Sequence, residues 1–519
     1  MKHRKLNMNN STLNRIHPDN LDLSEYKEEK EKLESIQNGP DKLFFIATYL
    51  ENNINVQDIF NNLFYNNNNI IINNLVKYYL IYILSLLDED VRKKSFPRMP
   101  VKTNNIIIDK NNPLHISQKL FQIYFFLLLY SEKTVQYTCL ELILEYSDKS
   151  QDFVDYCLKD IRYIEKVFTL TYNNNNSVIN KSLIILDIIL NNESCDEDDL
   201  EKLLQKNSII QRCKELLCDS KFDIDIKINS LELIETIADK MSTDYYKSYF
   251  YDYPQIFYEY MTHQPINETI IKLIYNISGK ISNEDTISLQ MKNTGLADLF
   301  YQHLSKQDLE TDFLLKLLTI FNNLLYMNEN ITYFIIEKNA DIIKVFISII
   351  NTYLHSLNEK ASKIFYDLLY CISNLVTGPN DTKFIISKSE LPNQILQVMK
   401  EKKNDNKVYS EGVRFFINII EDCDKETFCN ISEFHPFKLY AKGLKDTSDN
   451  KNLELYLKAM LELINKNNAV YHTIENLKNE YYMNLVKKRI DDLTFHTNEK
   501  ISQNAKLITN VFEDKMNME

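Results

Sequence analysis

Two stretches of this chain, which begin 51 residues apart, have nearly the same sequence. Residues 323–338 read NLLYMNENITYFIIEK, and residues 374–388 read NLVTGPNDTKFIISK. In both stretches an Asn-Leu pair ends one apolar segment and a Phe-Ile-Ile run lies in the next. Self-similarity at a period of this size indicates stacked helical repeats, because a single unit of this kind cannot bury its apolar face alone.

The same unit recurs along most of the chain. Each unit has a long apolar segment with helical periodicity, a polar turn, a shorter apolar stretch and another polar turn. Successive long segments are spaced by 43, 48, 41, 47, 51, 44 and 44 residues when measured at one equivalent position: Leu144, Asp187, Glu235, Asn276, Asn323, Asn374, Asn418 and Glu462. This spacing predicts units of two or three helices, with surface loops that absorb the differences in length.

Glycine and proline are scarce, with only 6 Gly and 10 Pro in 519 residues. Sheet folds and Gly-rich phosphate loops need glycine where the backbone has positive φ, so this composition favours helices joined by short polar turns. Hydrophobic residues make up 44% of the chain, which is enough for an extended core. We therefore predict an all-α, right-handed superhelical solenoid of about eight to nine repeats.

The pattern divides the chain into three parts. Residues 1–40 are polar and predict a flexible N-terminal tail. Residues 41–465 have the helical periodicity and predict the solenoid. In residues 466–519 the pattern loosens into a polar helix pair, Ile474–Val486 and Ile501–Phe512, which is typical of a terminal cap with a polar outer face.

Several classes of function are disfavoured by composition and motifs. The formal net charge of −13 does not suit direct nucleic-acid binding, which requires clustered Lys and Arg. The 8 Cys form no CxxC pair, and no run of 18 apolar residues predicts insertion into a membrane. We find no nucleophile elbow, phosphate-binding loop or HExxH pattern. We therefore expect a soluble intracellular protein that is not an enzyme, with no catalytic residues, no metal site and no cofactor.

One segment resembles a known repeat family. Residues 371–378 read CISNLVTG, residues 384–386 read FII, and Glu390-Leu391-Pro392 follow. This pattern resembles an armadillo repeat of the importin-α type, whose third helix ends in Ser-Asn and is followed by a short turn and a helix that begins with Pro. The resemblance extends over about residues 265–440, where Thr294–Ala297 and Asn339–Ile342 take the place of the corresponding turn.

The resemblance implies a peptide-binding groove. In importin-α, Asn residues on successive third helices bind the backbone of an extended peptide, because an amide side chain both donates and accepts hydrogen bonds. We call the corresponding residues here the ladder residues, and we expect them to line one concave surface: Asn276, Asn323, Asn374 and Asn418.

The aromatic part of that groove is reduced in this chain. Importin-α has a Trp four residues before each Asn, and these Trp rings clasp the lysine stems of the peptide. This chain contains no Trp. Only Tyr370 supplies a ring at such a position, beside Lys272, Thr319 and Arg414 at the other three.

Three functional interpretations stay open. The resemblance implies an adaptor in the cytoplasm and nucleus that carries cargo with basic signals in nuclear protein import, with an importin-β-like carrier as a further partner. The alternative is a general armadillo scaffold for a cytoskeletal, ciliary or signalling assembly. It is favoured by the few basic residues of the N-terminal tail: Lys2, Arg4, Lys5 and Arg15. A chaperone or GTPase regulator on the same frame is the third, and no specific residue supports it.

Overall fold

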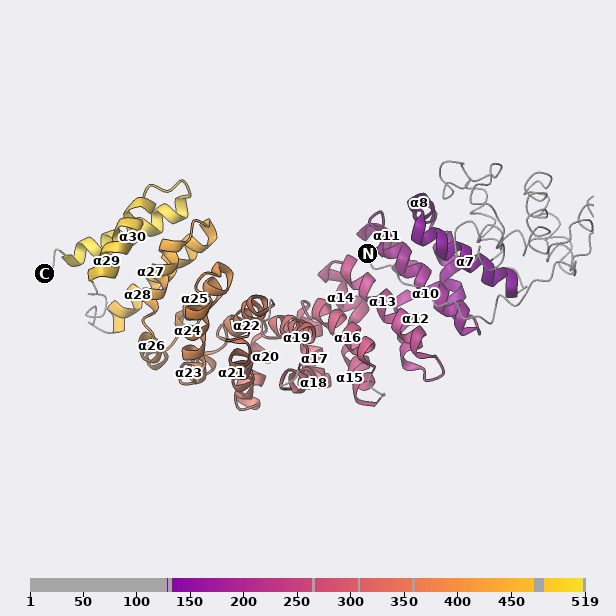
Figure 1. Ribbon diagram of the computed structural model, residues 1–519, viewed down its shortest axis with the longest axis horizontal. Coiled ribbons are helices and arrows are strands. Elements are labelled where there is room, and N and C mark those ends of the chain that lie inside the picture. Colours follow the sequence, from indigo (N-terminus) through magenta and orange to yellow (C-terminus); the bar gives the residue numbers. More distant parts are fainter. Residues whose placement is uncertain are drawn as a thin grey trace, which may run out of the picture. The chain divides into compact units, whose positions relative to one another are not determined.

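The computed structural model describes Leu128 and residues 133–263, 267–306, 309–356, 360–470 and 480–516. These residues form helices joined by short turns, and none of them lies in a β-strand (Figure 1). The all-α prediction is therefore confirmed. The predicted N-terminal tail and the solenoid residues before Leu128 lie outside the described residues. None of the described helices is both long enough and apolar enough to cross a membrane.

The chain forms two compact units, Met1–Ser242 and Thr243–Glu519. Helix α10 packs against both α7 and α13 in the first unit, so the three longest helices among its described residues form a stack. The described helices of this unit are α7 (Lys133–Lys149), α8 (Gln151–Lys159), α9 (Arg162–Thr169), η2 (Leu170–Tyr172), α10 (Asn176–Asn191), α11 (Glu197–Lys206), α12 (Ile209–Cys218) and α13 (Ile224–Lys240).

The second unit repeats a three-helix pattern. Its described helices are α14 (Thr243–Phe250), α15 (Tyr253–His263), α16 (Glu268–Ile281), α17 (Asp285–Thr294), α18 (Leu296–Leu304), α19 (Thr311–Leu324), α20 (Asn328–Thr332), η3 (Tyr333–Glu337), α21 (Asp341–Tyr353), α22 (Ala361–Leu375), α23 (Asn380–Ser387), α24 (Leu391–Glu401), α25 (Asn406–Ile420), α26 (Lys425–Ser432), α27 (Pro436–Asp446), α28 (Asn450–Val470), α29 (Glu480–Leu493) and α30 (Glu499–Met516). The predicted equivalent positions all fall in long helices, which in the described residues are α7, α10, α13, α16, α19, α22, α25 and α28.

The long helices of the second unit form one continuous row. Each of α16, α19, α22 and α25 packs against the next long helix, and the last contact is between α25 and α28. Figure 1 shows α16, α19 and α22 on one side of this unit and α15, α18 and α21 on the other. We call α16, α19, α22, α25 and α28 the third-helix row.

Helices of this row are covered by neighbours on most of their circumference. In α22, for example, only Lys363, Tyr366 and Tyr370 are exposed. A helix that is apolar nearly all round belongs inside a stack, and its remaining polar stripe marks the single face that meets solvent. Helix starts are set by polar caps: the Asn267 side chain accepts from Ile270 N at the start of α16, and Asp405 accepts from Val408 N at the start of α25.

Two of the turns predicted to be equivalent share a left-handed backbone. Gly295 has φ 85° between α17 and α18, and Asn339 and Ala340 have φ 52° and 56° between η3 and α21. Glycine adopts this conformation without steric cost, whereas an alanine there costs roughly 1–2 kcal/mol. The structural equivalence of these turns is confirmed, although only one of them has the residue that suits it best.

The C-terminal residues form helices that pack on the last repeat. Helix α30 contacts both α28 and α29, and it contains the predicted segment Ile501–Phe512. The other predicted segment, Ile474–Val486, overlaps α29, and its first residues lie outside the described part of the chain. Helix α28 continues to Val470, past the predicted end of the solenoid at residue 465.

Candidate binding surface

Three of the four ladder residues occupy the same position near the ends of neighbouring helices, and the fourth, Asn276, lies about one turn earlier on its helix. Asn276, Asn323, Asn374 and Asn418 lie on α16, α19, α22 and α25, each within two turns of the helix end. All four are half-buried, at the edge between the solvent-facing stripe and the adjoining helix. The structure therefore brings them onto one row of stacked helices, and their contact with a concave peptide-binding surface stays a prediction.

Two ladder residues hydrogen-bond the preceding long helix. The Nδ2 atom of Asn374 donates to the backbone carbonyl of Asn322 at 2.9 Å, and Nδ2 of Asn418 donates to the carbonyl of Ser373 at 3.1 Å. Each bond joins one repeat to the next. These carbonyls lie within the last turns of their helices, where the backbone acceptors lack intrahelical partners.

The other two ladder residues make related contacts. Nδ2 of Asn323 donates to the carbonyl of Gly279 at 2.8 Å and to the hydroxyl of Ser282 at 2.9 Å, both at the end of α16. Asn276 instead accepts a hydrogen bond from the Lys316 ammonium of α19. All four side chains therefore connect neighbouring long helices.

Part of the carboxamide is still available for a ligand in three of the ladder residues. An amide side chain has two N–H donors and a carbonyl acceptor with two lone pairs. Among the described residues, no donor reaches the side-chain oxygens of Asn323, Asn374 or Asn418, and the last two each use only one N–H. The bonds between helices thus hold the carboxamides in place and leave acceptors unused.

The residues four positions before each ladder residue face solvent. On a helix, side chains at i and i+4 lie on the same face, one turn apart. Together with Lys458, which lies four residues before Glu462 on α28, these residues form an exposed or half-exposed line across the third-helix row: Lys272, Thr319, Tyr370 and Arg414. Tyr370 is 37% exposed, so the predicted aromatic residue lies on this face one turn before Asn374.

A groove of about 650 Å³ lies between the first turns of α22 and α25. Tyr366 and Asp367 of α22 line one wall, and Glu411 and Arg414 of α25 line the other. Tyr366 is one helical turn before Tyr370 and is 36% exposed, so two exposed tyrosines lie on the same face of α22, and Tyr366 is the one that lines the groove.

Glu411 is the most deeply buried charged residue of the groove. It is only 4% exposed, and no hydrogen-bond partner for one of its carboxylate oxygens, Oε2, occurs among the described residues. Its other oxygen lies 3.4 Å from Nε of Arg414. Burial raises the pKa of Glu411, and the positive charge of Arg414 opposes that rise. The Arg414 side chain is 41% exposed, so the cation of this pair is the member that meets solvent.

Tyr366 and Glu411 were not predicted from the sequence as site residues. The position of Tyr366, four residues before Tyr370, is a signal that places both rings on one helical face. The burial of Glu411 depends on the packing of α22 against α25, and local sequence does not contain that information.

The surface does not continue in the same form in the first unit. Asp187 and Glu235 occupy the ladder position there, and Asp187 accepts a hydrogen bond from the Thr236 hydroxyl at 2.5 Å. The residues four positions earlier, Leu183 and Leu231, are each only 1% exposed. These leucines belong to the core, so in the described part of the chain the exposed line of side chains lies on helices of the second unit.

No protein-family model matches this chain, and no curated protein sequence matches it. Solved structures do. An engineered protein has a TM-score of 0.61 at 12% identity, over 82% of this chain and 97% of the other. A chain from a study of a phosphorylation switch in the interaction between cadherin and beta-catenin has a TM-score of 0.56 at 10% identity, over 85% and 71%. A designed armadillo repeat protein has a TM-score of 0.41 at 12% identity, over 49% and 98%.

At these identities the likeness shows the fold. The chain is an all-α solenoid of the armadillo type, built from stacked three-helix repeats. These comparisons do not distinguish importin-α from other armadillo proteins.

Proposed function

We propose that this chain is a non-enzymatic scaffold that binds an extended segment of a partner protein along the third-helix row of its second unit. The observation that supports this most strongly is the common register of three helices, α19, α22 and α25. Asn323, Asn374 and Asn418 present carboxamide acceptors at equivalent positions, beside an exposed line of side chains that includes Tyr370.

The spacing of these groups suits a peptide backbone. Packed helices lie about 8–10 Å apart, and an extended chain advances about 3.3 Å per residue. Successive ladder residues would therefore meet peptide units two to three residues apart. A carboxamide recognises the peptide group itself, so it binds without regard to side chains, and the exposed line then supplies selectivity.

A structural neighbour is consistent with this role. One of the similar chains comes from a study of the interaction between cadherin and beta-catenin. The fold of that chain and the fold of this one correspond over 85% of this chain. Protein binding is therefore the activity that the neighbour and the surface both favour.

A narrower candidate is the import adaptor. Tyr370 beside Asn374 favours it, because an aromatic ring next to a ladder Asn can hold the stem of a lysine. In that role the chain would bind basic signals, work with an importin-β-like carrier and be found in the cytoplasm and nucleus. A general scaffold would use the same surface for a segment of another charge.

Site-specific photo-crosslinking of the full-length chain tests the proposed surface. Linear peptides would first be selected from a randomised 12-residue library with the full chain as bait. Tyr370 would then be replaced by p-benzoylphenylalanine, and the matched control would carry the same replacement at Tyr251, which is 42% exposed in the turn between α14 and α15. We expect the selected peptides to cross-link at position 370 and not at position 251. Equal cross-linking at both positions, or selection of no peptide, would overturn the proposal.

A further inference from the structure

We infer that the segment held by the third-helix row is acidic. This inference rests on the proposed function and adds the charge of the partner. Its basis is the distribution of exposed cations and buried acids on this face, which differs from the charge of the chain as a whole.

Cations occupy two parallel lines of the face. The line that lies four residues before the ladder position has three basic residues, Lys272, Arg414 and Lys458, and no acid. A second line, eleven residues before the same equivalent positions, has an acid, Asp312, on α19 and exposed lysines on the next three helices of the row: Lys363, Lys407 and Lys451. Spacings of four and eleven residues both place side chains on the same helical face.

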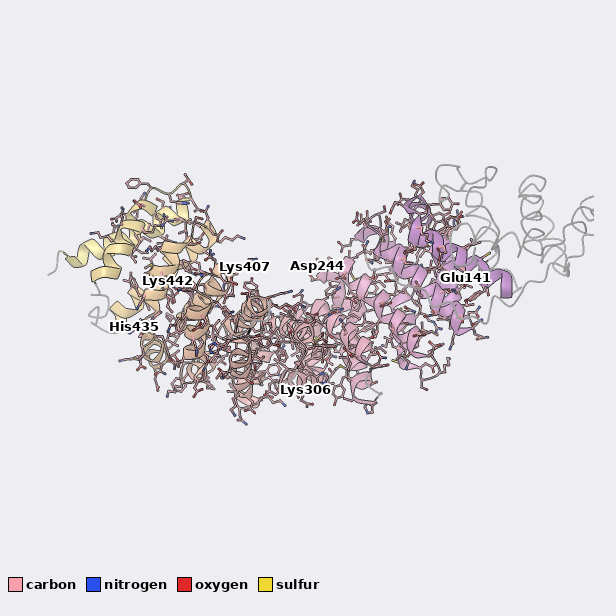
Figure 2. The ribbon with its side chains drawn as sticks, viewed as in Figure 1. Glu141, Asp244, Lys306, Lys407, His435 and Lys442 are labelled. Carbon is pink, nitrogen blue, oxygen red and sulfur yellow. The ribbon has the colours of Figure 1, made fainter. Side chains whose placement is uncertain are left out.

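Figure 2 separates this face from the opposite side of the unit. Lys407, at the start of α25, and Lys306, just after α18, are labelled at opposite edges of the second unit. Lys407 lies on the edge where Figure 1 shows α19, α22 and α25. Lys306 therefore provides a lysine of the same unit that does not belong to the face.

Two acids of this face are withdrawn from solvent, whereas Asp312 has a side chain that is 45% exposed and paired with a lysine. Glu411 is 4% exposed and lies beside Arg414, and Asp367 is half-buried. Burial raises the pKa of Asp367, and the nearby charge of Lys363 opposes that rise. An exposed acid also occurs, Glu268, but it is confined to the first turn of α16.

Asp312 shows that the cations of neighbouring helices act together. A hydrogen bond from the Lys360 ammonium is the main cause that lowers the pKa of Asp312, and the charges of Lys272 and Lys316 lower it further. The three lysines belong to or adjoin three consecutive long helices, α16, α19 and α22. One carboxylate at this point of the face is therefore attracted by cations from several repeats.

The rest of the chain makes this local excess significant. The formal net charge of the chain is −13, so non-specific attraction would favour basic peptides. A preference for acidic peptides must then come from a local surface. Exposed charges separated by more than about 8–10 Å are largely screened at physiological salt, so a bound segment responds mainly to the side chains that it contacts.

The test uses the full-length chain and the randomised 12-residue peptide library. Peptides would be sequenced after selection, and the affinity of individual peptides would be measured by fluorescence anisotropy. The test variant is Lys363→Glu with Lys407→Glu, which reverses two exposed charges at the groove. The control is Lys306→Glu with Lys344→Glu, which makes the same change in net charge at two exposed lysines off the face. Far-UV circular dichroism checks that both variants remain helical.

We expect Asp and Glu to be enriched in the selected peptides. Reversal at Lys363 and Lys407 should weaken binding on the order of tenfold or more, because like charges then face each other. The control pair should leave affinity within about twofold, since exposed charges away from the contact are screened. Affinity should also fall several-fold between about 50 mM and about 300 mM NaCl for the same reason.

Other results have distinct meanings. Enrichment of Lys and Arg would overturn the inference and support the import adaptor. Enrichment of neutral peptides that still cross-link at position 370 would overturn the charge inference and leave the proposed function standing. Failure to enrich any peptide would overturn the proposed function itself.

Discussion

The side chain of Asn374 donates a hydrogen bond to the backbone carbonyl of Asn322 at 2.9 Å, and this bond joins α22 to α19. One repeat later, Asn418 makes the same connection to Ser373. Asn374, which the resemblance to importin-α assigns to peptide binding, therefore also holds neighbouring repeats together. Because the bond restricts the carboxamide, its oxygen is oriented before any ligand arrives, and this reduces the entropy lost on binding.

Replacing Asn374 by Ala should destabilise the contact between α19 and α22. The lost hydrogen bond is worth about 0.5–1.5 kcal/mol, and more if the Asn322 carbonyl remains unpaired. Asn351→Ala is the matched control, because Asn351 is exposed on α21 and receives the same change in helix propensity. Urea unfolding followed by circular dichroism should give a lower midpoint for Asn374→Ala than for Asn351→Ala. Hydrogen exchange should quicken in α19 and α22.

Equal midpoints for the two variants would show that the inter-helix bond contributes no stability. In a repeat protein each interface contributes its own energy, so the hydrogen-exchange measurement locates the effect even where unfolding is not two-state.

Helical periodicity was enough to predict the row of long helices and the shared face of its side chains. An angle of about 100° per residue places Tyr370 and Asn374 on one face whatever the neighbouring helices are. The hydrogen-bond partner of Asn374 did not follow from that angle. A side chain at the edge of a face reaches either solvent or the next helix, and the distance between helices decides which.

Three-dimensional packing also determines which charges remain exposed. Glu411 and Arg414 are one turn apart in sequence, yet their exposed side-chain fractions are 6% and 41%. Similarly, Leu183 occupies a position that corresponds to Tyr370 but is buried in the first unit. Sequence spacing predicted the helical face on which each of these residues lies. How deeply each side chain is buried depends on the packing of the neighbouring repeats.

Gly443→Ala should destabilise the contact between α27 and α28. A Cβ atom at this position would lie 2.7 Å from Cε2 and 2.8 Å from Cζ of the Tyr456 ring. Tyr456 is only 1% exposed, and its hydroxyl oxygen lies at hydrogen-bond distance, 3.0 Å, from the Ser410 hydroxyl oxygen. The ring therefore has little room to move. We expect a loss of about 1–3 kcal/mol, typical of an overpacked core.

Gly279→Ala provides the control for this prediction. The added Cβ would meet Thr319 at 3.6 Å, which is ordinary contact. Gly279 lies inside α16, so alanine should raise stability by up to about 1 kcal/mol through helix propensity. The midpoint temperature of thermal unfolding should therefore fall for Gly443→Ala and rise for Gly279→Ala. A decrease of the same size for both would refute the packing argument.

Stability should depend on the protonation of His303. Burial is the main cause that lowers the pKa of His303 to about 4, and Lys306 contributes to the shift. The ring also hydrogen-bonds the Tyr275 hydroxyl. In the unfolded chain the His303 ring is protonated as the pH falls through its ordinary pKa of 6.5. In the folded chain it is protonated only near its lowered pKa of about 4. Stability from this residue is thus complete above the ordinary pKa and decreases as the pH falls through that window.

His303→Gln keeps a polar side chain and removes the titration. The unfolding midpoints of the wild-type chain and this variant should be compared from about pH 7.5 to about pH 4.5. We expect the wild-type chain to lose stability relative to the variant as the pH is lowered. A difference between the two that stays constant over the range would contradict the assigned cause.

The ladder residues should contribute directly to peptide affinity as well as to stability. We expect Asn323→Ala combined with Asn374→Ala to lower the affinity for a selected peptide on the order of tenfold or more. The reason is that each lost hydrogen bond is worth about 0.5–1.5 kcal/mol. Fluorescence anisotropy with the full-length chain gives the affinity. The variant also loses bonds between helices, so the control must suffer a similar structural loss away from the face.

Asn330→Ala is such a control. Asn330 is 1% exposed in α20 and donates to the Ser288 hydroxyl and to the Leu324 carbonyl, each at 3.1 Å. Its removal costs buried hydrogen bonds of the same kind and leaves the third-helix face unchanged. If ladder residues bind the peptide backbone, the double variant should lose affinity while Asn330→Ala keeps it. If both variants lose affinity to the same extent, the ladder acts through stability alone and the peptide is gripped by other groups.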